Sequence, residues 1–178
     1  MHDDPVETPM TDPTGGEHST LLASLNSQRR HVLGILDDVD DEALRRPVLP
    51  SGWSCLGLLR HLALDVERFW FRGVVAGEQA VANLVGGAEE DAWKVGPEVT
   101  AEEVFALYRQ QTALADAVLA ATTPDAAPAW WPAELFGDWR MDNVREVLLH
   151  VITETACHAG HLDAVRELID GRRWLVLD

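Results

Sequence analysis

The stretch LLHVITETACHAGHLDAVRELIDG, residues 148–171, has the apolar periodicity of a long α-helix and ends on a glycine suited to a helix C-terminus. It carries His150, Glu154, His158 and His161 at spacings of four, four and three residues. Because an α-helix turns by about 100° per residue, these side chains fall within about a quarter of its circumference. Glu154 and His158, one turn apart, can both reach one point in space. This polar stripe on a long helix predicts a functional site.

Three further segments predict helices, and with the first they predict an all-α four-helix bundle. The second helix has an N-cap at Ser54, the third opens on a capping box from Thr100 to Glu103, and the fourth begins at Asp142 or Asn143. No stretch alternates with period two for long enough to predict a sheet. Long connections separate the second helix from the third and the third from the fourth. The predicted helices span residues 19–39, 54–77, 100–124 and 142–171.

The 178 residues fit one domain preceded by a tail. Residues 1–18 are acidic and rich in Pro, Thr and Gly, so we expect a flexible N-terminal tail before a bundle domain of residues 19–178. Residues 78–99 predict a loop or short helix, and the Pro- and Trp-rich segment 124–139 predicts a loop. The candidates for a pocket wall in this last loop are Trp130, Trp131 and Trp139.

Charge and composition narrow the choice of partner. The chain has 30 acidic and 14 basic residues, for a formal charge of −16. This charge argues against nucleic acid, whose phosphates need Lys and Arg, and against anionic membrane surfaces. No apolar run approaches the roughly 20 residues needed to span a bilayer, and the N-terminus does not read as a signal peptide. Cys55 and Cys157 make no disulfide framework, so we expect a cytoplasmic protein that acts on a small molecule.

His61 on the predicted second helix is the natural partner of the polar stripe. It lies on the apolar side with Leu58 and Leu62, and Asp65 follows one turn later on the same face. Because apolar faces meet in a bundle, we expect His61 to point toward the fourth helix. Two imidazole nitrogens and a carboxylate oxygen would then converge, which is a three-ligand set for a catalytic divalent metal. Asp65 is expected to accept a hydrogen bond from a ligand imidazole.

The opposite faces of the same two helices are predicted to face solvent. This interpretation follows from the 3.6-residue period of an α-helix alone. It also places His31, on the first helix, in solvent. The residues assigned to the solvent side are Arg60, Glu67 and Phe71 on the second helix, and Arg145, Asp163 and Arg166 on the fourth.

Less specific explanations of the polar residues are open alternatives. A lone histidine such as His61 on an apolar face is more often a hydrogen-bonded core residue than a ligand. Histidine and glutamate four residues apart are also common on solvated helix faces. Burying a carboxylate with three imidazoles would cost on the order of several kcal/mol unless something such as a metal compensates the charge. The motifs GxGxxG, GxxxxGK[ST], HExxH and GxSxG are absent.

The segments GLLRHLALDVERFW (residues 57–70) and ETACHAGHLD (residues 154–163) resemble the DinB-like superfamily of metalloenzymes, in a high-GC bacterial branch of unknown function related to mycothiol-dependent enzymes. The resemblance covers residues from about 19 to 171. It implies a four-helix bundle that binds a divalent metal, often nickel or zinc. One histidine of the second helix and two residues four apart on the last helix hold this metal. The implied ligands are His61, Glu154 and His158.

The alignment leaves the choice of third ligand between Glu154 and His161. Glu154 stands where many members carry a histidine, and His161 stands where they carry a glutamine. A His-Glu-His triad occurs in the branch of mycothiol-dependent isomerases, which favours Glu154. His161 and Asp65 are then the candidate catalytic residues, which orient ligands or move a proton, and His150 flanks the site.

The resemblance implies an enzyme whose metal activates a low-molecular-weight thiol of the mycothiol or bacillithiol type. The expected reaction is S-transfer to, or isomerisation of, a small electrophile. Two alternatives stay open: a metal-dependent hydrolase of small molecules that uses a metal-bound water, and a non-catalytic bundle that binds a metal or ligand. Bundles of this kind often pair, so a homodimer is a further expectation.

Overall fold

The computed structural model describes residues 13–84 and 91–174, and within these ranges every regular element is a helix. The predicted all-α, four-helix class is confirmed. The predicted second helix is present as two consecutive elements, α3 and η1, which follow each other without a break. The elements are α1 (Pro13–Ile35), α2 (Asp41–Arg45), α3 (Cys55–His61), η1 (Leu62–Val75), α4 (Gln79–Ala82), α5 (Ala101–Ala120), α6 (Ala133–Phe136) and α7 (Val144–Asp170).

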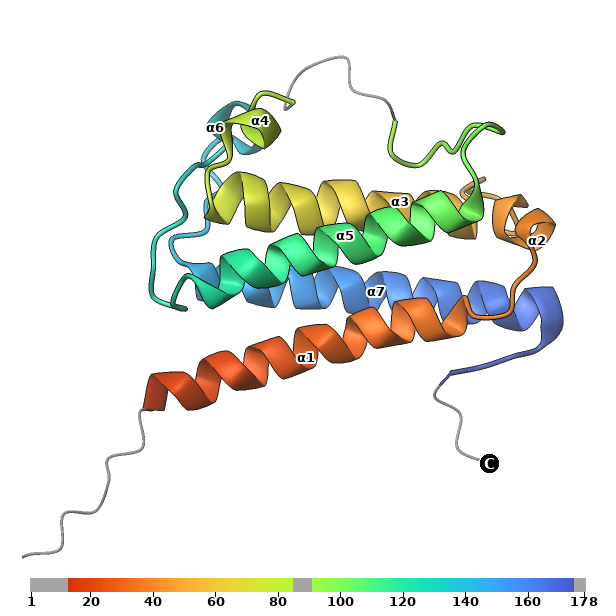
Figure 1. The fold of residues 1–178 in the computed structure, drawn as a ribbon, viewed down its shortest axis with the longest axis horizontal. Helices are drawn as coiled ribbons and strands as arrows, with labels where there is room; N and C mark the ends of the chain where they lie inside the picture. Colours follow the sequence, from red (N-terminus) through yellow and green to blue (C-terminus); the bar gives the residue numbers. More distant parts are fainter. Residues whose placement is uncertain (1–12, 85–90, 175–178) are drawn as a thin grey trace, which may run out of the picture.

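The four long helices pack as two pairs of parallel neighbours (Figure 1). Helix α1 runs in the same direction as α7, and α3–η1 runs in the same direction as α5 but opposite to the first pair. The chain therefore returns along the bundle between Val75 and Ala101, which explains the length of that connection. The side chains buried most completely between the helices include Leu25, Ile35, Leu56, Leu58, Phe71, Tyr108 and Leu162.

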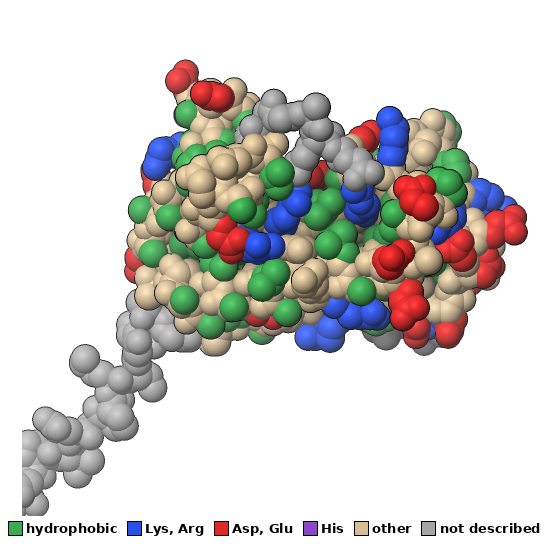
Figure 2. Space-filling model, turned by 45° about the horizontal axis from the view of Figure 1, so that its top comes forward, with side chains coloured by type: hydrophobic (Ala, Val, Ile, Leu, Met, Phe, Trp, Pro, Cys, Tyr) green, Lys and Arg blue, Asp and Glu red, His purple; other side chains and the backbone are tan. Residues whose placement is uncertain are grey.

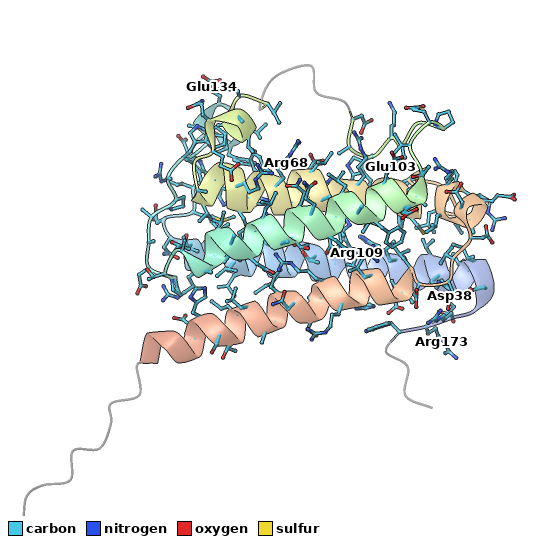
Figure 3. The ribbon with its side chains drawn as sticks, in the orientation of Figure 1. Asp38, Arg68, Glu103, Arg109, Glu134 and Arg173 are labelled. Carbon is cyan, nitrogen blue, oxygen red and sulfur yellow. The ribbon has the colours of Figure 1, made fainter. Side chains whose placement is uncertain are left out.

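The helix ends follow the capping signals in the sequence. The Ser54 side chain accepts a hydrogen bond at the start of α3, and Asn143 does the same for α7. Thr100 and Glu103 form a reciprocal capping box at the start of α5; Glu103 is labelled there in Figure 3. Helix α7 ends at Gly171 with φ +81°, a left-handed conformation that costs glycine little. The predicted boundaries of the second, third and fourth helices are therefore set by local chemistry.

The ends of the chain and its connections add detail to the prediction. Helix α1 begins at Pro13, before the expected start at Ser19, and the salt bridge from Arg145 of α7 to Glu17 (2.6 Å) holds its first turns against the bundle. Short helices α4 and α6 lie in the two predicted connections. The expected tail falls largely on residues 1–12, which are outside the described residues, as are residues 85–90 and 175–178.

The predicted solvent side of the second helix is wrong at two positions. Glu67 is 1% exposed and Phe71 is fully buried. The reason is that η1 is a π-helix, in which the backbone hydrogen bonds run from residue i+5 to residue i. The N–H of Ala76, for example, donates to the carbonyl oxygen of Phe71 at 2.9 Å. This wider turn rotates successive side chains away from the positions that an α-helical period of 3.6 residues assigns to them.

A buried ion pair accommodates the Glu67 carboxylate in the core. The guanidinium of Arg29 on α1 donates two hydrogen bonds to it, from Nε at 2.7 Å and from Nη2 at 2.6 Å. A third donor, Nη1, bonds to Asp116 of α5 at 2.6 Å. Arg29 is 5% exposed and Glu67 is 1% exposed, so this ion pair is almost dry, whereas the Asp116 side chain reaches solvent. A buried carboxylate needs both an opposite charge and hydrogen-bond donors to offset its lost hydration, and Arg29 supplies both. The same side chain thereby joins α1, η1 and α5.

The predicted solvent side of α7 is also wrong at Arg166, and His31 of α1 is not solvent-facing. Arg166 is 2% exposed and His31 is 6% exposed. Arg166 donates to the carbonyl oxygens of Ile35 (2.9 Å) and Asp37 (2.7 Å), which are left without helical partners at the end of α1. His31 lies 3.1 Å from Asp163. Helix α1 therefore covers the face of α7 that the charge pattern assigned to water.

The surface reflects the acidic composition. Figure 2 shows Asp and Glu side chains gathered on the end of the bundle that carries α2. None of the helices in residues 13–84 and 91–174 combines the length and the apolar character that crossing a membrane requires. Cys55 is buried and Cys157 is exposed, and both are free thiols.

Candidate metal centre

The structure brings His61, Glu154 and His158 together between α3 and α7. One donor atom from each residue lies within 4.8 Å of the other two. The rings of His61 and His158 meet edge to face with their centroids 5.2 Å apart. Nε2 of His158 lies 3.2 Å from the Glu154 carboxylate. His61 is the last residue of α3, so its direction still follows the α-helical period that predicted it.

His61 has one ring nitrogen held by a carboxylate and the other without a protein partner. Its Nδ1 lies 2.8 Å from Oδ2 of Asp65, one turn further along the helix. A neutral imidazole that donates from Nδ1 to this carboxylate keeps its lone pair on Nε2. Nε2 is buried and has no hydrogen-bond partner among the described residues. Asp65 thus contacts His61 at the nitrogen opposite the free one, which is the placement of a carboxylate that orients a ligand imidazole.

The surroundings of His158 favour its neutral form, which is the form that binds a metal. Burial lowers the pKa of its imidazole, the adjacent ring of His61 lowers it further, and the Glu154 carboxylate acts in the opposite sense. Only a neutral imidazole offers a lone pair to a cation. Glu154 supplies the negative charge that a divalent ion would neutralise, and it is the one carboxylate of the cluster. The donor set is thus two imidazole nitrogens and one carboxylate oxygen.

Trp93 is a residue of the site that the sequence analysis did not identify. Its ring stacks on His61 with centroids 4.2 Å apart and planes 20° from parallel. The same ring lies 5.8 Å from that of His158. Trp93 belongs to the aperiodic connection 91–99, where no spacing indicates a direction. One signal was present in the sequence: Gly57 in an otherwise bulky helix, at the point where the Trp93 backbone approaches α3.

Gly57→Ala should destabilise the protein and displace this wall of the site. The added Cβ would overlap the carbonyl oxygen of Trp93, and a backbone atom cannot rotate away as a side chain can. We expect the free energy of unfolding to fall by about 1–3 kcal/mol, measured by urea denaturation. Gly160→Ala on α7 is the matched control, because nothing lies within 4 Å of its added Cβ. It should be neutral or stabilise by up to about 1 kcal/mol. Equal unfolding curves for both variants would contradict the close approach at Gly57.

His161 lies beside the cluster, as the sequence predicted, but on its exposed side. Its Nδ1 is 3.5 Å from Nδ1 of His158. Its ring centroid is 6.3 Å from that of Trp53, a second aromatic residue that the sequence analysis did not assign to the site. His161 does not belong to the group of donor atoms that converge within 4.8 Å. His161 therefore stands outside the three converging donors.

His150 lies one turn before Glu154 and faces an aromatic cluster. Its ring is 4.6 Å from Trp70 and 5.8 Å from Trp139. Burial lowers the pKa of His150, with Glu154 acting in the opposite sense. His150 thus flanks the three converging residues and connects them to the Trp-rich end of the bundle.

The three predicted pocket tryptophans do not share one wall. Trp131 and Trp139 contact each other, with Nε1 of Trp131 donating to the carbonyl oxygen of Trp139 at 3.1 Å. Trp130 and Trp131 line a hollow of about 330 Å³ beside α6, together with Glu134, which is labelled in Figure 3. Trp139 is 46% exposed and lies outside that lining.

Comparison with known proteins gives one family. The family model described as Mycothiol-S-transferase matches residues 20–171, which is most of the chain and all four long helices apart from the first turns of α1. A search of curated proteins found no match. The matched range contains every residue of the candidate metal centre.

Proposed function

We propose that this chain, which belongs to the mycothiol-S-transferase family of metal-dependent enzymes, holds its metal on His61, Glu154 and His158. The observation that carries the proposal is the convergence of three donor atoms within 4.8 Å, one of which is the buried, unpartnered Nε2 of His61. Of the activities that the sequence left open, family membership favours S-transfer, and it indicates mycothiol as the thiol.

The donor set suits a divalent cation on chemical grounds. A buried nitrogen without a hydrogen bond is costly in the absence of a partner, and a cation would use its lone pair. Two imidazoles and a carboxylate are ligands of zinc and nickel, and three protein ligands leave room for a donor from the substrate. Such a metal, when bound, acts as a Lewis acid that lowers the pKa of a coordinating thiol. We therefore assign zinc or nickel to this site.

We assign the thiol proton to His161. Its exposed imidazole lies against His158, within reach of a substrate that approaches the cluster from solvent. The thiol S–H bond breaks and the proton moves to a ring nitrogen of His161, while the sulfur electron pair forms the bond to the electrophilic carbon. The leaving group departs with its bonding electrons and takes the proton back from His161. Asp65 contributes by fixing the ring of His61.

The electrophile is assigned to the aromatic side of the cluster. His150, one turn before Glu154, contacts the ring of Trp70, which in turn lies 6.1 Å from Trp131 in the wall of the hollow beside α6. Aromatic walls favour a flat or apolar molecule over a charged one. We place the reaction in a reducing cytoplasm, because both cysteines are free and one of them, Cys157, is exposed one residue from His158.

Removal and return of the metal tests this function. Protein purified without a histidine tag is stripped with a chelator, and the consumption of mycothiol is followed with chlorodinitrobenzene as electrophile. We expect the rate to fall to the uncatalysed background and to return when zinc or nickel is added. An unchanged rate in protein shown to be free of metal would contradict the metal-dependent mechanism. Consumption of electrophile without loss of thiol would indicate hydrolysis instead.

A further inference from the structure

We propose that the cleft between Trp53 and Trp93 binds the hydroxyl-rich, non-reacting part of the thiol substrate. This inference rests on the proposed function, which makes that substrate mycothiol: a cysteine thiol carried on an amino sugar joined to inositol. The cleft has a volume of about 320 Å³, at the lower end of the range of small-molecule sites. Its lining consists of Ser51, Gly52, Trp53, Asp91, Trp93 and Lys94.

Two walls of this cleft are also neighbours of the metal centre. Trp93 stacks on His61 at 4.2 Å, and Trp53 lies 6.3 Å from His161. A molecule held between the two indoles therefore lies next to the cluster where its sulfur must react. Among the described residues, those that line the hollow beside α6, or another hollow of about 470 Å³ between the ends of η1 and α5, make no ring contact with His61, His158 or His161.

The chemistry of the cleft fits a polyhydroxylated ring. The C–H faces of such a ring pack on indole, and its hydroxyl edge needs acceptors and donors. Asp91 and Lys94 supply one of each, 3.2 Å apart. The N–H of Trp93 and the ammonium of Lys94 hold the pKa of Asp91 below its ordinary value, so its carboxylate is an ionised acceptor. Both side chains are exposed, so a ligand in the cleft can reach them.

The wall that carries Trp93 is preorganised. Nη1 of Arg60, on α3, donates to the carbonyl oxygens of Asp91 (3.0 Å) and Lys94 (3.1 Å), which brackets the turn that carries the tryptophan. The Trp93 N–H donates to Oδ1 of Asp91 at 3.0 Å. Gly57 lets this turn approach the helix backbone directly. A wall fixed in advance loses little conformational entropy when a ligand binds.

The test uses glucosaminyl-inositol, which has the rings of mycothiol but no thiol, so that binding is measured without turnover. Calorimetric titration of the metal-loaded protein should show binding, and Trp53→Leu should raise the dissociation constant about tenfold, the effect of losing one aromatic contact. Trp174→Leu, which removes an indole from the C-terminal segment outside the cleft, is the matched control and should bind like the wild type. Metal content is measured for each protein.

A parallel assay separates this inference from the proposed function. The ratio of kcat/KM for mycothiol to kcat/KM for N-acetylcysteine, which lacks the rings, should fall about tenfold in Trp53→Leu. The inference is overturned if glucosaminyl-inositol does not bind the wild type, or if Trp53→Leu binds it equally well. Metal-dependent turnover with an unchanged ratio of kcat/KM values would contradict the binding role of the cleft but support the transferase activity. If Trp53→Leu loses binding of glucosaminyl-inositol and the wild type does not turn over mycothiol, the result would contradict the transferase activity but support the binding role of the cleft.

Discussion

His61→Ala should lose both the metal and the thiol transfer. The variant removes the one donor that α3 contributes, and Glu154 and His158 remain as a two-residue set on a single helix. Loss of an outer hydrogen-bond partner already costs roughly 10–100-fold in metal affinity or activity, so loss of a direct ligand should exceed the upper limit of that range. We expect metal analysis of untagged protein to find almost no zinc or nickel, and kcat/KM for mycothiol to fall by more than about 100-fold.

Two further variants make this result specific. Asp65→Asn keeps the ligand but weakens its orientation, because an amide that replaces the carboxylate no longer fixes the proton on Nδ1 of His61. It should lower metal affinity by roughly 10–100-fold, between wild type and His61→Ala. His31→Ala removes a buried imidazole of α1 whose contacts are with Asp163 and Trp174 rather than with the three converging residues, and it should retain the full metal content. Equal metal in His61→Ala and wild type would refute the site.

The accuracy of the sequence-based prediction changes where the helix type changes. His61 ends α3, and Glu154 and His158 lie on the regular helix α7, so an α-helical period placed all three correctly. The π-helix begins at Leu62, directly after His61, and from there the same period misplaced Glu67 and Phe71. The expected contact between Asp65 and His61 is present despite the change of helix type, because it is local and spans one turn. Nothing in the apolar pattern of residues 62–75 separates a π-helix from an α-helix.

The loop residues of the site could not be placed for a different reason. Trp93 reaches His61 from a connection without periodicity, and its position depends on the Arg60 donors and the space at Gly57. These are contacts over more than 30 residues, which local sequence rules do not encode. The solvent assignment of Arg166 failed similarly, because a charged side chain that caps the end of α1 is indistinguishable in sequence from one in water.

Arg29→Met should produce the largest loss of stability. It leaves the carboxylate of Glu67 in the core without its bidentate partner, and removing one member of a buried ion pair costs about 3–5 kcal/mol. Burial already raises the pKa of Glu67 in the native protein, against the opposing effect of Arg29. Without Arg29, protonation is the remaining way to neutralise this group. The measurement is the free energy of unfolding in urea as a function of pH.

The pH dependence has a definite sign because the folded pKa of Glu67 lies above the unfolded value. The folded state then favours the neutral acid. The loss in free energy of unfolding caused by Arg29→Met is therefore greatest at high pH, and it becomes smaller as the pH falls through the folded pKa of Glu67 toward the ordinary value of 4.5. Arg29→Met/Glu67→Leu removes both charges and should regain most of the lost stability at all pH values. Arg140→Met, which breaks an exposed pair with Asp142, should leave the urea midpoint almost unchanged. A double variant as unstable as Arg29→Met would show that packing around α1, η1 and α5, rather than the unpaired carboxylate, causes the loss.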